Sequence, residues 1–366
     1  MAQLPFTVQR KNRFIYAIIS LAFCMLFVAC DANTSLNGIS LGANNSTSSS
    51  GSTTIGQGTQ GVQVFVEPTA GESVITNAIG QAKQSVWLEL YLLTDSKVVR
   101  ALEDAAGRGI DVRVMLEPHP YGGGSISPRE TLDKLSAAGI KAQPTSSSFS
   151  LTHEKGLIID GQTAYIMTCN LTLAALGVGK STKNREYGII DNNAQDVQAV
   201  IAIFNADWNH SNAQYNDPNL VVSPDNSRNA FASLINGAHK TLAIEAEEMQ
   251  DSQIEQDLAN AAQRGVQVQV ILPAGSSSSE SDGSDSNGQG ISTIKQAGVQ
   301  VEEDHHLYMH AKIIVVDSQQ AFVGSENIST ASLDHNRELG LIVSDQNVLT
   351  TLQQTFQQDW GASQAA

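Results

Sequence analysis

The 366-residue sequence is poor in cysteine and in positive charge, and each shortage excludes a class of protein. Of its three cysteines, Cys24 and Cys30 lie near the N-terminus and only Cys169 lies in the rest of the chain, so a framework of disulfides is excluded there. Lys and Arg number 21 against 37 Asp and Glu, which gives a formal net charge of −16. Such an acidic chain is a poor candidate for broad, non-specific binding of nucleic acid.

Long apolar runs are also scarce, since the N-terminal run from Phe14 to Val28 has 15 residues and is short for a membrane span. It follows the basic stretch 10–13 and ends at Ala29-Cys30, which are the parts of a bacterial secretion signal. We expect residues 1–30 to be a signal peptide of the lipoprotein type, with Cys30 lipidated. The protein would then be exported, and either membrane-anchored or extracellular; plain secretion and a retained anchor are the alternatives.

Residues 31–60 consist mainly of Ser, Thr, Asn, Gly and Gln, and this composition predicts a flexible linker. Without the segment 1–30 the chain has 18 basic and 37 acidic residues, a net charge of −19. The remaining roughly 300 residues are enough for one large or two medium hydrophobic cores.

One short pattern occurs twice in the chain. The first copy is His-Glu-Lys-Gly-Leu-Ile-Ile-Asp at 153–160, and the second is His-Ala-Lys-Ile-Ile-Val-Val-Asp at 310–317, 157 positions later. The apolar run after each Lys predicts a buried strand, on which His and Lys lie on the same face because they are two residues apart. Asp160-Gly161 is typical of a hairpin turn, so the next apolar run should be a returning strand.

The expected returning strands carry polar residues two apart, namely Thr168 with Asn170 and Ser325 with Asn327. Each copy therefore offers an imidazole, an ammonium, a hydroxyl and an amide to one small volume, a set suited to an anionic phosphate. The candidate residues are His153, Lys155, His310 and Lys312 for catalysis, with Thr168, Asn170, Ser325 and Asn327 for binding phosphate.

The repetition extends well beyond the short pattern. Asn-Arg-Glu at 184–186 returns at 336–338, and Phe-x-x-Asp-Trp at 204–208 returns at 356–360, each 152 positions later. Strands alternate with helices in both halves, which predicts an α/β fold of two tandem α/β/α sandwich repeats, 61–215 and 216–366. With one His-Lys set in each half, we expect a pseudo-twofold axis, an active site at the interface and a monomer that is internally a pseudo-dimer.

The paired His-x-Lys-x(4)-Asp motifs, each with a downstream Asn, Asn-Arg-Glu and Phe-x-x-Asp-Trp, resemble the phospholipase D superfamily over residues 62–361. The resemblance implies a phosphodiesterase or phosphatidyltransferase. It implies that Glu186 and Glu338 orient the catalytic histidines, and that Asp160 and Asp317 support the turns. Glu89 and Glu245 are candidates for the floor of the site or for carboxylates at the surface.

The chemistry also follows from the residues alone. Cleavage of a phosphodiester needs a nucleophile, a proton donor for the leaving alcohol and positive charge around the phosphate oxygens. One His would attack phosphorus and form a phosphohistidine while the other protonates the alcohol, and the lysines would supply the charge. We therefore expect no cofactor and no metal; Asp304-His305-His306 near His310 is the weaker metal alternative.

The leading hypothesis is an exported phospholipase D-like enzyme that hydrolyses or transfers the phosphatidyl group of glycerophospholipids. Its partners would be the phospholipid substrate and a membrane surface, reached through the lipid anchor. The alternatives are an endonuclease of the same chemistry, a cardiolipin synthase-like phosphatidyltransferase and a non-catalytic binding lipoprotein. The acidic balance disfavours the nuclease, and the presence of both His and both Lys disfavours the binding protein.

Overall fold

The computed structural model describes residues 55–121, 127–180, 182–276 and 287–366. The expected signal peptide with Cys30, and the expected linker up to residue 54, lie outside the described residues. Within the described ranges, no helix combines the length and the apolar character needed to cross a bilayer.

The first repeat folds around one mixed sheet with the strand order β1-β7-β6-β5-β2-β3-β4. Its elements are β1 (Gln63–Glu67), α1 (Ser73–Gln81), β2 (Ser85–Leu90), α2 (Ser96–Gly107), β3 (Asp111–Leu116), α3 (Pro128–Ala137), β4 (Lys141–Pro144), β5 (Lys155–Ile159), β6 (Thr163–Met167), β7 (Asn184–Asp191) and α4 (Ala194–Trp208).

The second repeat has the corresponding strand order β8-β17-β15-β14-β9-β11-β12, with β18 added at the β12 edge. Its elements are β8 (Leu220–Ser223), α5 (Ser227–Asn236), β9 (Thr241–Glu245), β10 (Met249–Gln250), α6 (Ser252–Gln263), β11 (Gln267–Pro273), α7 (Gly288–Gln296), β12 (Gln300–Asp304), β13 (Tyr308–Met309), β14 (Ile313–Val316), β15 (Gln320–Gly324), β16 (Ile328–Ser329), α8 (Thr330–Asp334), β17 (Glu338–Val343), α9 (Gln346–Ala362) and β18 (Gln364–Ala365). The matching orders confirm two tandem α/β repeats.

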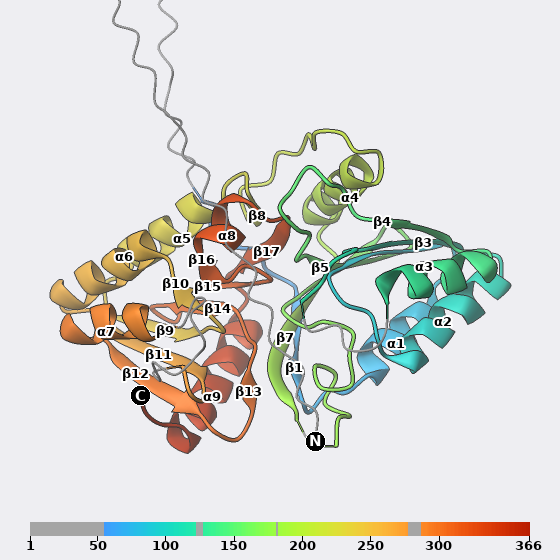
Figure 1. Ribbon diagram of the computed structural model, residues 1–366. Helices are drawn as coiled ribbons and strands as arrows, with labels where there is room; N and C mark the ends of the chain where they lie inside the picture. The colour runs from blue at the N-terminus through green and yellow to red at the C-terminus, as the bar shows by residue number, and fades with distance from the viewer. Residues whose placement is uncertain (1–54, 122–126, 181, 277–286) are drawn as a thin grey trace, which may run out of the picture. The chain divides into compact units, whose positions relative to one another are not determined.

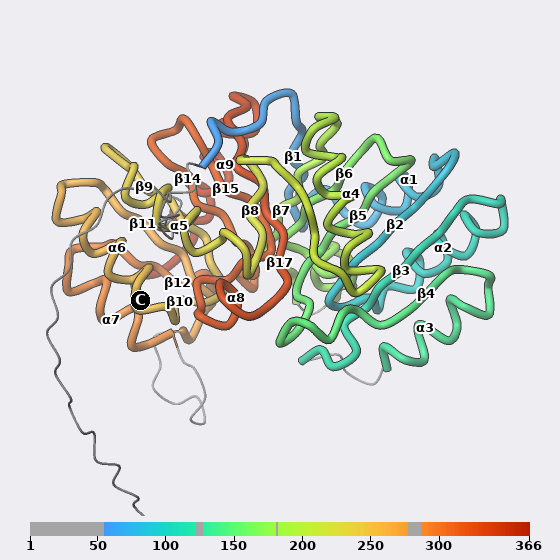
Figure 2. The backbone as a smooth tube through the Cα atoms, turned by 90° about the horizontal axis from the view of Figure 1, so that it is seen from above, coloured from blue at the N-terminus to red at the C-terminus, as the bar shows by residue number. Residues whose placement is uncertain are grey.

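Each repeat is a sandwich because its strands are apolar on both faces. In β14, Ile313 and Val315 face a central core that α4 and α9 also enter, whereas Ile314 and Val316 face an outer core with α5, α6 and α7. In the first repeat, the outer core is formed with α1, α2 and α3. Figure 1 shows these two outer helix groups on opposite sides of the two sheets. Strands β7 and β17 run between them in Figures 1 and 2.

The motif hairpins turn at the predicted aspartates. Asp160, Gly161 and Gln162 join β5 to β6, and Asp160 and Gly161 have the positive φ angles, 56° and 63°, of a tight turn. Asp160 also accepts hydrogen bonds from the backbone N–H groups of residues 83–85, just before β2. Asp317 accepts the same three bonds from residues 239–241 before β9. Both aspartates therefore tie a hairpin to the neighbouring helix–strand turn, away from the imidazoles.

The end of the expected linker differs from its prediction. Residues 55–60 lie against the second repeat: the N–H of Gly56 donates to the carbonyl of Pro218, and that of Thr59 donates to Ile342. Thr59 is buried, and its hydroxyl donates to Asp196 at 2.5 Å. Polar composition predicted a free chain here, but these hydrogen bonds give the segment a fixed path.

Candidate active site

The two halves of the site are aligned by two short parallel bridges between the repeats. Thr152 pairs with Arg337, and Met309, in β13, pairs with Arg185 in β7. One residue further along each chain, His153 therefore stands opposite Glu338, and His310 stands opposite Glu186. The register of two backbone pairings thus sets which carboxylate meets which imidazole, and each pair crosses between the repeats.

The first crossed pair joins His153 to Glu338. The Nδ1 atom of His153 lies 3.1 and 3.0 Å from the two carboxylate oxygens, and Ser332 donates a hydrogen bond of 2.7 Å to the same carboxylate. Burial raises the pKa of Glu338, but its interactions with His153, Lys155 and Ser332 outweigh burial and bring the pKa below its ordinary value. An ionised Glu338 holds the proton on Nδ1 and leaves Nε2 as the reactive nitrogen.

The second crossed pair joins His310 to Glu186. Nδ1 of His310 lies 2.9 Å from Oε2 of Glu186, and both side chains are buried. Thr168 and Asn184 donate hydrogen bonds of 2.6 and 3.0 Å to the oxygens of Glu186. Both catalytic candidates are therefore held through Nδ1 by a carboxylate that is itself fixed, an arrangement that orients the opposite ring nitrogen.

The two lysines stand beside their histidines, as strand parity predicted. Lys155 donates a hydrogen bond of 2.5 Å to the carbonyl of His153, and Lys312 donates one of 2.8 Å to the carbonyl of His310. Burial lowers the pKa of Lys155 to about 7 and, together with the nearby lysine charges, lowers the pKa of His153 to about 4. At neutral pH, His153 is therefore an uncharged imidazole, the form that can act as a nucleophile.

The amides and the hydroxyls of the motifs differ in what they can bind. The side-chain oxygens of Asn170 and Asn327 are buried without a hydrogen-bond partner on the described residues. An amide oxygen only accepts, so a phosphate oxygen would have to bind the Nδ2 groups, and this role stays a prediction. Thr168 and Ser325 are fully buried, and their hydroxyls accept the backbone N–H of the residue after each glutamate, Tyr187 and Leu339. These contacts fix the glutamate strands, and phosphate binding by the two hydroxyls stays a prediction.

Glu247 belongs to the site but was not found from the sequence. It follows β9, and its Oε2 atom lies 2.7 Å from Nζ of Lys312 and 3.4 Å from Nε2 of His310. Its other oxygen accepts a hydrogen bond of 3.0 Å from Tyr308. The only available signal was its position two residues after Glu245, near the end of a strand next to the motif strand.

Two buried ion pairs explain why the Asn-Arg-Glu and Phe-x-x-Asp-Trp patterns recur. Arg185 of the first repeat contacts Asp359 in α9 of the second at 2.6 and 2.7 Å. Arg337 of the second repeat contacts Asp207 in α4 of the first at 2.8 and 3.1 Å. Each arginine precedes a site glutamate, so the pairs lock the two strands that carry Glu186 and Glu338.

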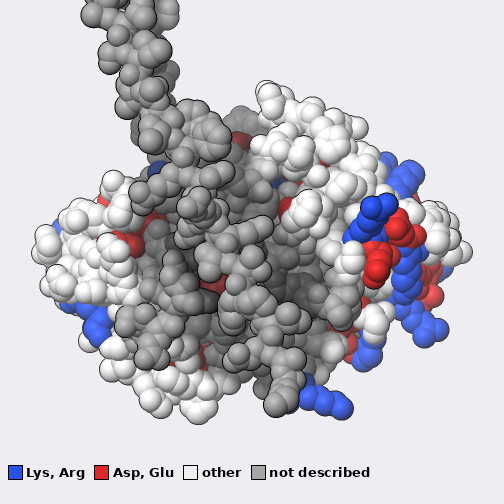
Figure 3. Space-filling view, in the orientation of Figure 1, with Lys and Arg blue, Asp and Glu red and all other residues white. Residues whose placement is uncertain are grey.

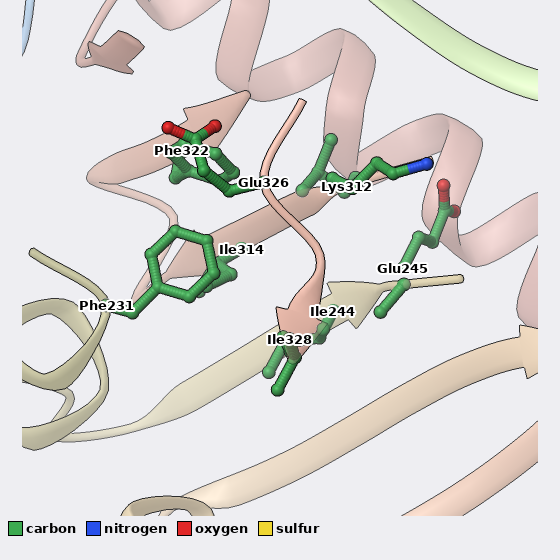
Figure 4. Close-up of a pocket in the computed structure, with 10 residues that line it drawn as sticks. Phe231, Ile244, Glu245, Lys312, Ile314, Phe322, Glu326 and Ile328 are labelled. Atoms are coloured by element: carbon green, nitrogen blue, oxygen red, sulfur yellow. The ribbon is translucent and has the colours of Figure 1, made fainter. Parts of the chain in front are cut away.

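Glu89 and Glu245 lie on β2 and β9, the strands that pair with the motif strands β5 and β14, and both are buried, which excludes the alternative of carboxylates at the surface. Burial raises the pKa of both well above the ordinary range, as it does for Glu326. Glu326 and Glu245 both line a small cavity in the second repeat (Figure 4). Gly324 and Gly340 pair across β15 and β17, and a Cβ at either would lie within 3 Å of the Glu326 carboxylate.

One group of described residues has the composition of a metal site. Carboxylate oxygens of Glu89, Glu154 and Asp207 all lie within 4.8 Å of one another. Arg337 already supplies a positive charge to Asp207, and burial raises the pKa of Glu154 to about 8, so protons also reduce the negative charge of this group. These three residues could hold a cation, but the group faces Arg337 rather than the catalytic imidazoles.

The face drawn in Figure 3 shows where basic side chains gather. They lie mainly over the outer helices of the first repeat, where acidic side chains are interspersed with them. Ion pairs of this kind include Lys134 with Glu103 and Lys141 with Asp111. On the described part of this face, basic and acidic side chains therefore lie side by side.

The two tandem repeats agree with the comparison with protein families. Residues 75–208 and 231–360 each match the family described as "Cardiolipin synthase, PLD-like domain". The matches cover most of the chain and coincide with the two repeats. The chain belongs to the phospholipase D superfamily.

Individual relatives are distant. The chain is 24% identical over 321 residues to a cardiolipin synthase of Clostridium perfringens, covering 77% of this chain and 66% of that protein. It is 23% identical over 332 residues to the probable cardiolipin synthase YwiE of Bacillus subtilis, covering 79% and 64%. The chain thus spans slightly less than two thirds of the length of these relatives. The crystal structure of a phosphatidylserine synthase from Haemophilus influenzae has the same fold, with a TM-score of 0.64, 13% identity and coverage of 84% and 88%.

Proposed function

We propose that this protein is an enzyme that transfers the phosphatidyl group of a glycerophospholipid, through a phosphohistidine, to an alcohol or to water. The observation that carries the proposal is the pair of crossed His–Glu contacts, each beside a buried lysine. A two-step displacement at phosphorus requires one imidazole as the nucleophile, a second as the acid and base, and positive charge for the phosphate oxygens. The two histidines and two lysines meet these needs.

In the first step, Nε2 of His153 attacks phosphorus, and the bond between phosphorus and the leaving alcohol breaks. His310 gives its Nε2 proton to the alcohol oxygen as that bond breaks. Lys155, Lys312 and the amides of Asn170 and Asn327 stabilise the charge on the non-bridging oxygens. His153 takes the nucleophilic role because its lowered pKa keeps it uncharged.

In the second step, His310 removes a proton from the acceptor hydroxyl, whose oxygen then forms the new bond to phosphorus. The bond between phosphorus and His153 breaks, and both histidines return to their starting forms. Glu186 and Glu338 keep the Nδ1 protons in place throughout. The lysines supply the positive charge, so the scheme uses no metal ion.

An alcohol acceptor is favoured over water because the relatives described above are a cardiolipin synthase and a probable cardiolipin synthase. A hydrolase of the same mechanism differs only in the acceptor that reaches His310. Transfer between two phosphatidylglycerol molecules is therefore the first reaction to test, and hydrolysis to phosphatidic acid is the second.

The test uses the full-length protein and phosphatidylglycerol vesicles, with and without a strong chelator, followed by lipid mass spectrometry. We expect a new phospholipid product that forms equally well with chelator and is absent with His153→Ala. Single-stranded DNA serves as the competing substrate. Cleavage of DNA without any lipid product would replace this proposal with the nuclease, and no turnover of either substrate would favour the binding lipoprotein.

We further propose that the protein is exported and anchored by a lipid on Cys30, on the strength of the basic, apolar and Ala-Cys sequence of residues 10–30. The full-length protein should partition with membranes, and Cys30→Ala should release it or leave it unprocessed. Cys24→Ala is the matched control, with expected wild-type behaviour. Unchanged fractionation and N-terminal mass in Cys30→Ala would exclude the anchor.

A further inference from the structure

Glu247 is a charged group of the site for which the proposed mechanism has no role. Its carboxylate bridges the ammonium of Lys312 and Nε2 of His310, at 2.7 and 3.4 Å. These are the same two groups that the proposed function assigns to the substrate, Lys312 for a phosphate oxygen and His310 Nε2 for the alcohol. The carboxylate therefore stands where an oxyanion of the substrate has to bind.

The Glu247 carboxylate is ionised at neutral pH. Burial raises the pKa of Glu247, but the positive charges of His310 and Lys312 outweigh it and bring the pKa far below the ordinary value. Two anions cannot share one ammonium in a partly enclosed site without strong repulsion. A phosphate can contact Lys312 fully only when Glu247 has moved away.

The side chain is placed so that it can move. Glu247 lies between β9 and β10, outside both strands, and its side chain is 19% exposed. Its contact with Tyr308 is a single hydrogen bond to a residue that is 44% exposed. Rotation of the side chain alone would release Lys312, without a change in the sheet.

The first repeat has no such anion at the matching position. Tyr91 lies 156 residues before Glu247, as Glu89 does before Glu245. Its ring packs against the His153 ring with centroids 4.7 Å apart, and Nζ of Lys155 lies 5.2 Å from its centre. The two half-sites therefore present different charges to a ligand, although their motifs match.

We propose that Glu247 is an internal anion that occupies the phosphate position of the second half-site and makes the enzyme selective against small phosphate ions. The inference rests on the proposed function, in which Lys312 and His310 receive a phosphodiester. An inorganic phosphate ion binds through its oxygens alone, and the free energy of this binding is too small to displace the Glu247 carboxylate. A phospholipid also binds through its glycerol and acyl parts, and this additional binding offsets the displacement.

The test measures the affinity of inorganic phosphate for the full-length protein by calorimetry, with no turnover involved. Glu247→Gln removes the charge and keeps the shape, and we expect phosphate to bind at least about tenfold more tightly. The gain should disappear in the double variant Glu247→Gln/Lys312→Ala. Asp104→Asn, at an exposed carboxylate of α2, controls for the change in net charge and should bind phosphate as the wild type does.

Glu247→Ala should shift phosphate binding in the same direction, which protects the test against poor folding of one variant. Unchanged or weaker binding in both variants, or a gain that persists without Lys312, would overturn the inference. So would a hundredfold loss of kcat in Glu247→Gln with unchanged phosphate affinity, because the carboxylate would then act in the chemistry. If phosphate binding tightens but no phospholipid is turned over, the inference stands and the proposed function fails.

Discussion

The imidazole of His153 and the carboxylate of Glu338 are 185 residues apart in the sequence and 3.0 Å apart in the structure. Glu338→Gln should lower kcat by about 10²- to 10⁴-fold, because the amide no longer selects the Nδ1–H tautomer or stabilises the imidazolium. Steady-state kinetics and the pH profile measure the effect, and Glu338→Asp should recover part of the activity. Asp104→Asn is the charge-matched control. A loss of less than threefold in Glu338→Gln would show that the contact does not position His153.

The roles of the two histidines can be separated with a p-nitrophenyl phosphodiester, whose leaving group needs no proton. Each His→Ala variant should lose roughly three or more powers of ten in turnover of phospholipid. His310→Ala should still release a burst of p-nitrophenol and carry a covalent phosphate on His153, found by mass spectrometry. His153→Ala should give no burst. A burst in His153→Ala, with the phosphate on His310, would exchange the two roles.

The value of kcat/KM should fall at both low and high pH. Because burial lowers the pKa of His153 to about 4, kcat/KM should rise as the pH increases through about 4 and the imidazole loses its proton. Because burial lowers the pKa of Lys155 to about 7, kcat/KM should fall above about 7, where the ammonium needed to bind phosphate is lost. Lys155→Arg should move the upper limit to higher pH, since a guanidinium keeps its charge. An unchanged upper limit in this variant would assign it to another group.

The two ion pairs between the repeats, Arg185–Asp359 and Arg337–Asp207, should stabilise the fold as well as position the site glutamates. Arg185→Met leaves Asp359 buried without its partner and should lower the free energy of unfolding by about 3–5 kcal/mol, measured by urea denaturation. The double variant Arg185→Met/Asp359→Leu should recover most of the loss. Lys134→Met, which removes an exposed ion pair with Glu103, should change stability by less than about 1 kcal/mol. A small effect of Arg185→Met would indicate that water reaches Asp359.

The sequence predicted the fold and the motif residues because those features repeat or follow local rules. The 157-residue spacing revealed the duplication, and strand parity placed His and Lys together. Strand parity did not predict the contacts of the Thr168 and Ser325 hydroxyls, which accept the backbone N–H of the residue after each glutamate. Which Glu meets which His depends on parallel bridges between distant segments, and no local pattern encodes their register.

Glu247 and Glu326 show the other limit of prediction from sequence. Both stand at positions where the two repeats differ, since Tyr91 matches Glu247 and Cys169 matches Glu326. Comparison of the halves therefore marks them only as mismatches. Their significance depends on what surrounds them. Glu247 contacts a lysine and an imidazole, and the Glu326 carboxylate lies beside two glycines.

The exchange of glutamates between the repeats has a consequence for how such a chain can arise. A single ancestral repeat of this kind has a histidine whose carboxylate partner lies in another copy, so it can complete its site only as a homodimer of two identical polypeptides. Gene fusion then makes each half a separate target for mutation. Differences such as Tyr91 against Glu247 require two separate copies of the repeat, because in a homodimer every substitution appears twice around the axis.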